Sequence, residues 1–132
     1  MNDNIILINP RELIAHEKVN LWRAILVYFH MSFTGRFNVP ILVDSKTKTI
    51  LDGHHRCYAA NRMRLKKVPC YPIDYLDNPS IDVHTRRPEI FIDKNAVLKM
   101  ALSEGVFPQK TTRHIYTLPS FQPYRLRDLW QQ

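Results

Sequence analysis

The sequence predicts an α+β domain, with a small mixed sheet and helices packed on it. Short β-rich runs alternate along the chain with segments of helical periodicity. Hydrophobic residues make up 45% of the chain and charged residues 23%, which is typical of a folded protein. A length of 132 residues suits one hydrophobic core, so we expect a single domain over residues 1–132.

The first elements predicted are a strand, a helical turn and a long helix. Residues 5–8 are an apolar run typical of a strand, and residues 10–13 form one helical turn with proline at an early position. Apolar residues then recur at three- and four-residue intervals, which predicts an amphipathic helix over about residues 17–32. We expect Trp22 and Phe29 of this helix to lie in the core.

The middle of the chain predicts a hairpin, a helix and a further strand. Two β-rich runs, residues 38–44 and 48–51, are joined by a polar turn. A helix follows from Gly53 to about Met63. Residues 67–75 are again β-rich, and because they carry two prolines we expect an edge position or a bulged strand.

The last third predicts one strand and one helix before an apolar tail. Residues 81–85 alternate as a strand does, and Asp93 can cap a helix over residues 95–103. Three apolar residues near the end of the chain can dock on the core: Leu126, Leu129 and Trp130.

Charge and cysteine content limit the possible partners and compartments. The formal net charge of +7 predicts anionic partners, without separating a nucleic acid from a nucleotide or a phosphorylated metabolite. Cys57 and Cys70 lack the spacing of a metal site, so we expect reduced thiols. No apolar stretch is long enough to span a bilayer and no basic targeting segment opens the chain, so we expect a cytoplasmic protein without membrane contact.

One strand–turn–helix segment carries the strongest functional signal. Asp52 and Gly53 end an apolar run, and three basic residues open the helix: His54, His55 and Arg56. The first N–H groups of a helix have no intrahelical partner and attract anions, phosphate in particular. Basic side chains are unfavourable at this end of a helix, so their presence indicates function.

A second basic, donor-rich cluster lies near the C-terminus. It consists of Lys110, Thr111, Thr112, Arg113 and His114. Together the two clusters can hold a polyphosphate from two sides. The alternative is that the charged residues belong to a solvated surface and the threonines cap a turn.

Two carboxylates lie next to the predicted phosphate site in the sequence or at the end of a predicted element. Such a reaction depends on positioning, on charge neutralisation and on a carboxylate that accepts the proton of the attacking hydroxyl. Glu17 and Asp52 are the candidates. The structural alternatives are an acid at a helix start for Glu17 and an N-cap for Asp52.

Several ordered matches resemble the ParB/sulfiredoxin-like superfamily and, within it, the free-serine kinases (SerK-like). They are Asp-Gly-His-His-Arg at 52–56, His-Glu at 16–17, Val-x-Thr at 83–85, Phe-x-x-Lys-Thr-Thr-Arg-His at 107–114 and the ending around Asp128. Sulfiredoxins carry a nucleophilic cysteine after the glycine, where this chain has His54, so sulfinic acid reduction is excluded. ParB proteins carry a Gly-Glu-Arg-Arg-type motif and continue into a DNA-binding domain.

The resemblance implies a kinase that transfers a phosphoryl group from ATP or ADP to free L-serine, with Mg²⁺. It implies Glu17 as general base, Asp52 as a second acid, and residues 53–56 and 110–114 as the two sides of the phosphate site. Aromatic residues expected after Thr85 are replaced by Arg86 and Arg87, which are candidates for the substrate carboxylate or else a solvated pair. The alternative function is a ParB-like nucleotide- or DNA-binding regulator without phosphoryl transfer. A nuclease is weaker, because no cluster of metal-binding carboxylates is visible.

Overall fold

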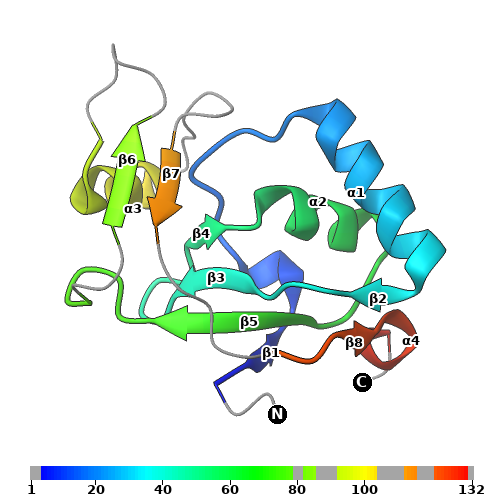
Figure 1. The fold of residues 1–132 in the computed structure, drawn as a ribbon. Coiled ribbons are helices and arrows are strands. Elements are labelled where there is room, and N and C mark those ends of the chain that lie inside the picture. Colours follow the sequence, from blue (N-terminus) through cyan, green and yellow to red (C-terminus); the bar gives the residue numbers. More distant parts are fainter. Residues whose placement is uncertain (1–3, 79–81, 86–91, 104–111, 116–120, 131–132) are drawn as a thin grey trace.

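The computed structural model describes residues 4–78, 82–85, 92–103, 112–115 and 121–130 (Figure 1). The elements in chain order are β1 (Ile6–Ile8), the 3-10 turn η1 (Pro10–Glu12), α1 (Leu21–Thr34), β2 (Arg36–Phe37), β3 (Ile41–Asp44), β4 (Ile50–Asp52), α2 (His54–Arg62), β5 (Val68–Ile73), β6 (Asp82–Thr85), α3 (Lys94–Leu102), β7 (Thr112–Ile115), β8 (Tyr124–Arg125) and α4 (Leu126–Leu129). The predicted α+β class is confirmed. In the part of the chain that the structure describes, no helix combines the length and apolar character needed to cross a membrane.

A mixed four-stranded sheet of order β1-β5-β3-β4 forms the centre. β3 pairs antiparallel with β4, β5 pairs parallel with β3, and β1 pairs antiparallel with β5. The predicted hairpin is therefore correct. Its turn is closed by the buried Asp44, whose Oδ2 accepts hydrogen bonds from the N–H and the hydroxyl of Thr47 at 3.0 and 2.7 Å.

The predicted edge position of the proline-containing strand is wrong. β5 lies inside the sheet, with β1 on one side and β3 on the other. β1 pairs with the first half of β5, at Val68, Pro69 and Cys70. Pro72 lies in the second half, where β3 is the neighbouring strand among the described residues. The short β1 thus leaves half of the strand open on one side, which a proline tolerates.

Both faces of the sheet are buried. Ile41 and Val43 pack into one cluster with α2 and α4, whereas Leu42, between them, packs into a second cluster with residues of β6 and α3. Successive side chains of a strand point to opposite faces, so the continuous apolar run of β3 fits a two-sided sheet. Figure 1 shows α2 lying along the sheet, with α1 outside it.

α1 begins later than the sequence pattern predicts. The Asn20 side chain accepts a hydrogen bond from the Arg23 N–H at 3.2 Å and starts the helix at Leu21 instead of residue 17. Residues 17–20 lie outside the helix, and the backbone of Asn20 is extended. Gly35, with φ +68°, ends the helix in the left-handed conformation that glycine adopts readily.

The predicted core positions of α1 are wrong. Trp22 and Phe29 have exposed fractions of 75% and 63%. The helix instead turns its smaller side chains inward, with Ala24 and Met31 buried. α1 is apolar on more than one face, so the periodic pattern identifies a helix without showing which face is inside.

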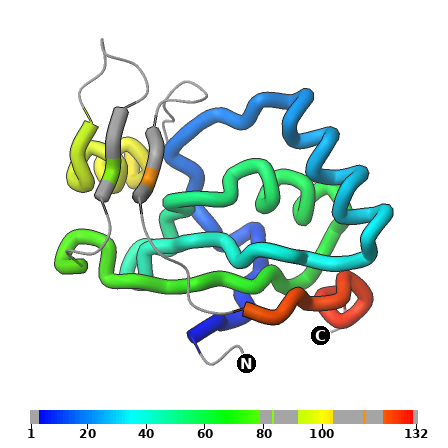
Figure 2. Tube along the Cα trace, viewed as in Figure 1, coloured from blue at the N-terminus to red at the C-terminus, as the bar shows by residue number. Residues whose placement is uncertain are grey.

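The remaining predicted elements are confirmed with small shifts in their bounds. α2, α3 and β6 form where predicted, and Asp93 caps α3 by accepting a hydrogen bond from the Ala96 N–H at 2.7 Å. Leu126 and Leu129 of α4 are buried, as expected for a docked tail, whereas Trp130 is 43% exposed and its Nε1 donates to the Met63 carbonyl at 2.9 Å. The described start of the chain (blue) and its described end (red) both lie in the lower part of the view in Figure 2.

Both cysteines are free and buried, as expected of reduced thiols. Burial raises the pKa of Cys57 to about 11 and that of Cys70 to about 12. Such thiols are poor nucleophiles at neutral pH, which agrees with the absence of a catalytic cysteine from the functional motif.

Candidate active site

A glycine turn with positive φ joins β4 to α2. Gly53 is buried, has φ +112° and precedes the first residue of the helix. A Cβ at this position would lie 3.0 Å from Arg56 Nη2 and 3.2 Å from Ile41 Cγ1, so any side chain would push these neighbours aside as well as adopt a backbone conformation that favours glycine. The Cys57 N–H donates to the Gly53 carbonyl at 2.9 Å, which closes the first helical turn. Asp52 is exposed at the end of β4, and the capping position belongs to Gly53.

The N–H groups of residues 54–56 come before the first intrahelical donor, which is the Cys57 N–H. Helix geometry gives them no partner within α2, and they point outward from its positive end. The turn therefore has the geometry of an anion site.

The segment before α1 runs along β4 and across this helix end. Ile14 forms an isolated parallel bridge with Thr49, and the Ile50 N–H donates to the Ile14 carbonyl at 2.7 Å. Two residues later, His16 Nδ1 lies 2.7 Å from the Ile50 carbonyl oxygen. Because a carbonyl only accepts, Nδ1 must carry the proton in this contact.

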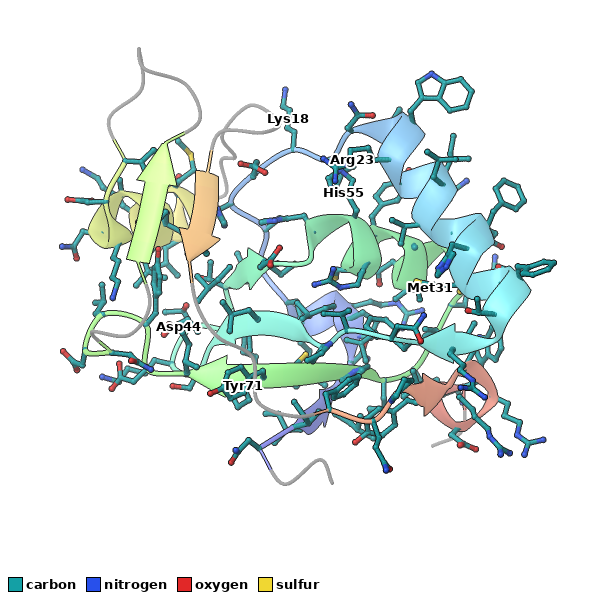
Figure 3. The ribbon with its side chains drawn as sticks, viewed as in Figure 1. Lys18, Arg23, Met31, Asp44, His55 and Tyr71 are labelled. Carbon is teal, nitrogen blue, oxygen red and sulfur yellow. The ribbon has the colours of Figure 1, made fainter. Side chains whose placement is uncertain are left out.

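Two histidines of α2 fasten this segment to the helix. His54 Nε2 accepts the His16 N–H at 3.2 Å, and His55 Nε2 accepts the Asn20 N–H at 3.0 Å. Glu17 thus lies on a short stretch of backbone held at both ends against the first turn of α2. Figure 3 shows His55 where the segment meets the helix, with Lys18 pointing away from it.

The buried histidines of this cluster are neutral at pH 7. Burial lowers the pKa of His16 to about 4, against the opposing effect of its bond to the Ile50 carbonyl. Burial lowers the pKa of His54 well below its usual value, helped by the neighbouring histidines and Arg56. The His16 and His54 rings lie edge to face with centroids 4.6 Å apart. A neutral His54 is also the form that can accept an N–H at Nε2.

These contacts change how the histidines at 54 and 55 can serve a phosphate site. The sequence predicts their side chains as phosphate ligands, but each uses Nε2 to accept a backbone N–H of the segment. The buried neutral imidazole of His54 brings no positive charge. Its direct contribution to an anion site is a backbone N–H.

Arg56 is the cationic side chain that this turn contributes. Its Nη2 donates to the Pro40 carbonyl at 3.3 Å, and its Nε is buried without a partner among the described residues. A guanidinium is always protonated, so an unused buried N–H favours a nearby anion. Arg56 also borders a pocket of about 370 Å³, whose other lining residues are Leu26, Val27, His30, Met31, Phe37, Asn38 and Val39.

β7 brings the second predicted cluster toward the first. β7 was not predicted as a strand; it pairs antiparallel with β6, with Val83 opposite His114. The His114 ring lies 5.8 Å from that of His16, and His114 Nε2 is 2.8 Å from the Tyr75 hydroxyl. Tyr75 is buried and was not predicted as a site residue, because nothing in its sequence neighbourhood marks it.

Several predicted residues lie outside what the structure describes. For Thr85, Thr112 and Arg113 the backbone is described within the β6–β7 pair, where Thr85 lies opposite Thr112. Lys110, Thr111, Arg86 and Arg87 lie outside the described residues. Of the second cluster, the structure therefore brings the His114 side chain to the site.

Known proteins of two kinds are similar to this chain in sequence. No protein-family model matches the chain. A ParB-like protein of Sulfolobus acidocaldarius is 39% identical over 70 residues, which are 52% of this chain and 34% of that protein. An ATP-dependent L-serine kinase of Staphylothermus marinus is 30% identical over 105 residues, 76% of this chain and 41% of the kinase.

A solved structure of a free serine kinase in complex with AMP superposes with a TM-score of 0.85, at 14% identity, over 96% of this chain and 93% of that one. The chain has the ParB/sulfiredoxin-like fold of the free serine kinases. The resemblance stated from the sequence motifs is confirmed. This ParB/sulfiredoxin-like chain spans 34–41% of the length of the curated relatives named above.

Proposed function

We propose that this protein is a nucleotide-dependent kinase that transfers a phosphoryl group from ATP or ADP to free L-serine and yields O-phosphoserine. The observation that carries the proposal is the double attachment of the Glu17 segment to the first turn of α2, through His54 and His55. These bonds hold the backbone on either side of Glu17 against a helix end suited to phosphate, and the proposal is that the Glu17 carboxylate faces the same site. The sequence similarity to ATP-dependent L-serine kinases supports the same reaction.

The nucleotide phosphates would bind at the glycine turn. The N–H groups of residues 54–56 and the guanidinium of Arg56 are the donors we assign to them. The pocket of about 370 Å³ beside Arg56 is lined mainly by apolar side chains and offers space for the base. Residues 110–114 would close the phosphate site from the β7 side, where His114 already meets His16.

Glu17 would act as the general base. The serine hydroxyl oxygen attacks the terminal phosphorus of the nucleotide, a new O–P bond forms, and the bond to the bridging oxygen breaks with release of the shortened nucleotide. The hydroxyl proton passes to the Glu17 carboxylate. Thr85, Arg86 and Arg87 are the residues we propose near the serine, with an arginine meeting its carboxylate.

The proposal includes a magnesium ion that arrives with the nucleotide and is held mainly by its phosphates. Among the described residues, no three His, Cys, Asp or Glu side chains cluster as metal ligands. Mg²⁺ is commonly held by one or two carboxylates together with substrate phosphates. Asp52, exposed at the end of β4 beside the turn, is the carboxylate we assign to this role or to orienting the hydroxyl. Bound magnesium would neutralise phosphate charge during transfer.

A product assay tests the proposal directly. The protein is incubated with L-serine, Mg²⁺ and either ATP or ADP, and O-phosphoserine is sought by mass spectrometry. We expect product with at least one nucleotide. The absence of product from serine, and from any other amino-acid or sugar acceptor, would contradict a kinase.

The variant Glu17→Gln separates catalysis from binding. Loss of a general base should lower turnover by about 100-fold or more while nucleotide affinity stays unchanged. Glu12→Gln is the matched control, because Glu12 is an exposed acid paired with Lys48 at 2.8 Å, away from the turn. Equal turnover in the two variants would contradict the role of Glu17 as general base.

A regulator of ParB type is the second candidate, favoured by the ParB-like relative and the net charge of +7. Such a protein would bind nucleotide or DNA without forming phosphoserine, and Glu17→Gln would leave its binding unchanged. A DNA affinity that falls steeply with salt, together with no product in the serine assay, would favour this function.

A further inference from the structure

α1 presents an uncharged apolar surface to solvent, which we call the α1 face. It consists of Leu21, Trp22, Ile25, Leu26, Phe29 and Phe33, with exposed fractions from 42% for Ile25 to 94% for Phe33. At 3.6 residues per turn these side chains occupy a continuous arc of about 140°. Ser32 is the one polar residue within that arc, and Arg23 and His30 lie beyond its border.

The α1 face is larger than the apolar patches that monomeric proteins usually expose. Aromatic side chains bury about 150–250 Å² each, so three aromatic and three aliphatic residues at these exposures present roughly 800 Å². A standard protein interface buries about 800 Å² on each partner, and exposed patches on monomers are commonly smaller. The area therefore suits one side of a stable dimer.

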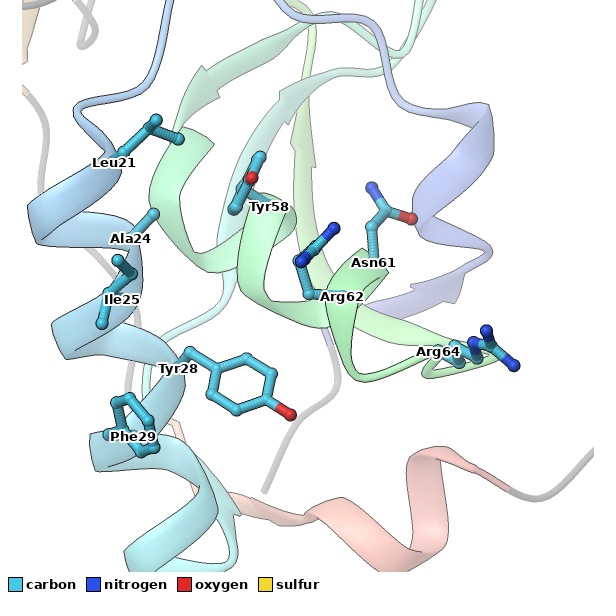
Figure 4. Close-up of a pocket in the computed structure, with 9 residues that line it drawn as sticks. All are labelled: Leu21, Ala24, Ile25, Tyr28, Phe29, Tyr58, Asn61, Arg62 and Arg64. Carbon is cyan, nitrogen blue, oxygen red and sulfur yellow. The ribbon is translucent and has the colours of Figure 1, made fainter.

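A groove extends this surface toward α2. It has a volume of about 590 Å³ and lies between α1 and α2, with Leu21, Ile25 and Phe29 on one wall and Tyr58 and Arg62 on the other (Figure 4). The α1 face provides a ridge of side chains and the groove provides a hollow beside it. Helices that pack closely place the ridges of one helix in the grooves of the other.

We propose that the α1 face binds the α1 face of a second copy of this chain, as an antiparallel pair with a two-fold axis near the level of Val27. The apolar residues recur at three- and four-residue intervals, the pattern of a helix seam with a shallow crossing angle of about 20°. In this register Leu21 faces Phe33 of the other copy, and Ile25 faces Phe29. Both of these contacts join an aliphatic to an aromatic side chain, and Trp22 faces the small Ser32, so large side chains lie opposite smaller ones.

Charge favours this occupant over an acidic protein or a membrane. The interior of the α1 face has no basic residue to attract an anion, and cores of homodimer interfaces are apolar and depleted of charge. The antiparallel arrangement also places the positive N-terminal end of each helix, with Arg23, beside the negative C-terminal end of the other.

The molecular mass in solution tests the proposal. Sedimentation equilibrium over a wide concentration range should give twice the 15.6 kDa of one chain. Phe29→Glu and Phe33→Glu should each raise the dimer Kd by roughly tenfold or more, as expected at a buried aromatic contact. Leu102→Glu is the matched control: it introduces the same charge at a residue of α3 with a 60% exposed fraction and should leave the dimer intact. Circular dichroism should show all three variants folded, because the replaced side chains are exposed.

Cross-linking tests the register. Ile25→Cys and Phe29→Cys, mixed under oxidising conditions, should give more disulfide-linked dimer than either variant alone, while Leu102→Cys gives none. A wild-type protein that is monomeric at every concentration overturns the proposal, whether it floats with phosphatidylserine vesicles or not. A dimer that persists in Phe29→Glu and Phe33→Glu overturns it as well.

Discussion

Gly53 should be the least replaceable residue of the candidate site. Alanine there must adopt φ +112° and place its Cβ 3.0 Å from Arg56 Nη2 and 3.2 Å from Ile41 Cγ1. We expect Gly53→Ala to lower the free energy of unfolding by about 1–3 kcal/mol and, by displacing the guanidinium, to weaken nucleotide binding. Urea unfolding and calorimetric titration with nucleotide measure the two effects.

Gly35→Ala is the control for backbone strain alone. Gly35 also has a positive φ, +68°, but a Cβ there would meet nothing within 4 Å. It should cost about 1–2 kcal/mol of stability and leave nucleotide affinity unchanged. Equal nucleotide affinities for Gly53→Ala and Gly35→Ala would show that the close approach of Arg56 does not matter for binding.

Acid should destabilise the fold through its buried histidines. Burial holds the pKa of His16 at about 4, against an ordinary value of 6.5. Between these values the unfolded chain takes up a proton that the folded protein does not, so stability is full above about pH 6.5 and falls as the pH is lowered toward 4. For His16 the loss amounts to at most about 3 kcal/mol, and the lowered pKa of His54 acts in the same direction.

Urea unfolding at a series of pH values measures this loss. The wild type should lose stability between pH 7 and pH 5, and the His16→Gln variant should lose less over the same interval because it has no group to titrate at this position. Comparing slopes, not absolute stabilities, allows for the lost bond to the Ile50 carbonyl. A wild-type stability that is constant from pH 7 to pH 5 would contradict the neutral histidine cluster.

Residue chemistry explains which parts of the site the sequence could predict. The glycine turn is visible because an Asp-Gly pair stops an apolar run and basic residues follow at an unfavourable helix position. The attachment of Asn20 to His55 and of His114 to Tyr75 is not visible, because each joins residues that are 35 to 39 positions apart. Sequence spacing carries no signal for such contacts.

At the level of elements, the short α4 should be an integral part of the core. Leu129 is fully buried, and its carbonyl accepts the N–H groups of Lys66 and Lys67 at 3.0 and 3.1 Å. We expect Leu129→Ala to lower the free energy of unfolding by about 2–5 kcal/mol through the cavity it leaves. Leu102→Ala, at an exposed position of α3, should change it by no more than about 0.5 kcal/mol. Chemical denaturation compares them, and equal losses would show that α4 does not support the core.

The boundary of an element was predictable where a capping residue marks it, as the Asp93 side chain does at the start of α3. The start of α1 was mispredicted because the apolar spacing continues back to Val19, whereas the N–H groups of His16 and Asn20 are bound to His54 and His55 and Asn20 caps the helix. The inward face of α1 was mispredicted because the larger apolar residues are the exposed ones. The spacing of apolar residues identifies a helix with an apolar face, but packing against the rest of the protein decides which face of that helix is buried.

For the molecule as a whole, the sequence predicts the fold class and leaves strand order open. Local runs predicted most of the strands, but the insertion of β5 between β1 and β3 depends on pairing between distant segments. The two-sided burial of the sheet follows from that order, since α2 covers one face while α3 and β6 cover the other.

The net charge of +7 predicts two salt responses of opposite sign. Two copies of a basic protein repel each other, so added salt should strengthen self-association through the uncharged α1 face by screening that repulsion. Nucleotide binding at the basic turn should weaken over the same range, because salt screens the attraction between phosphate and Arg56. Sedimentation and nucleotide titration at low and high ionic strength measure both. Self-association that weakens with salt would indicate that attraction between opposite charges, such as Arg23 and the facing helix end, outweighs the repulsion between the two basic copies.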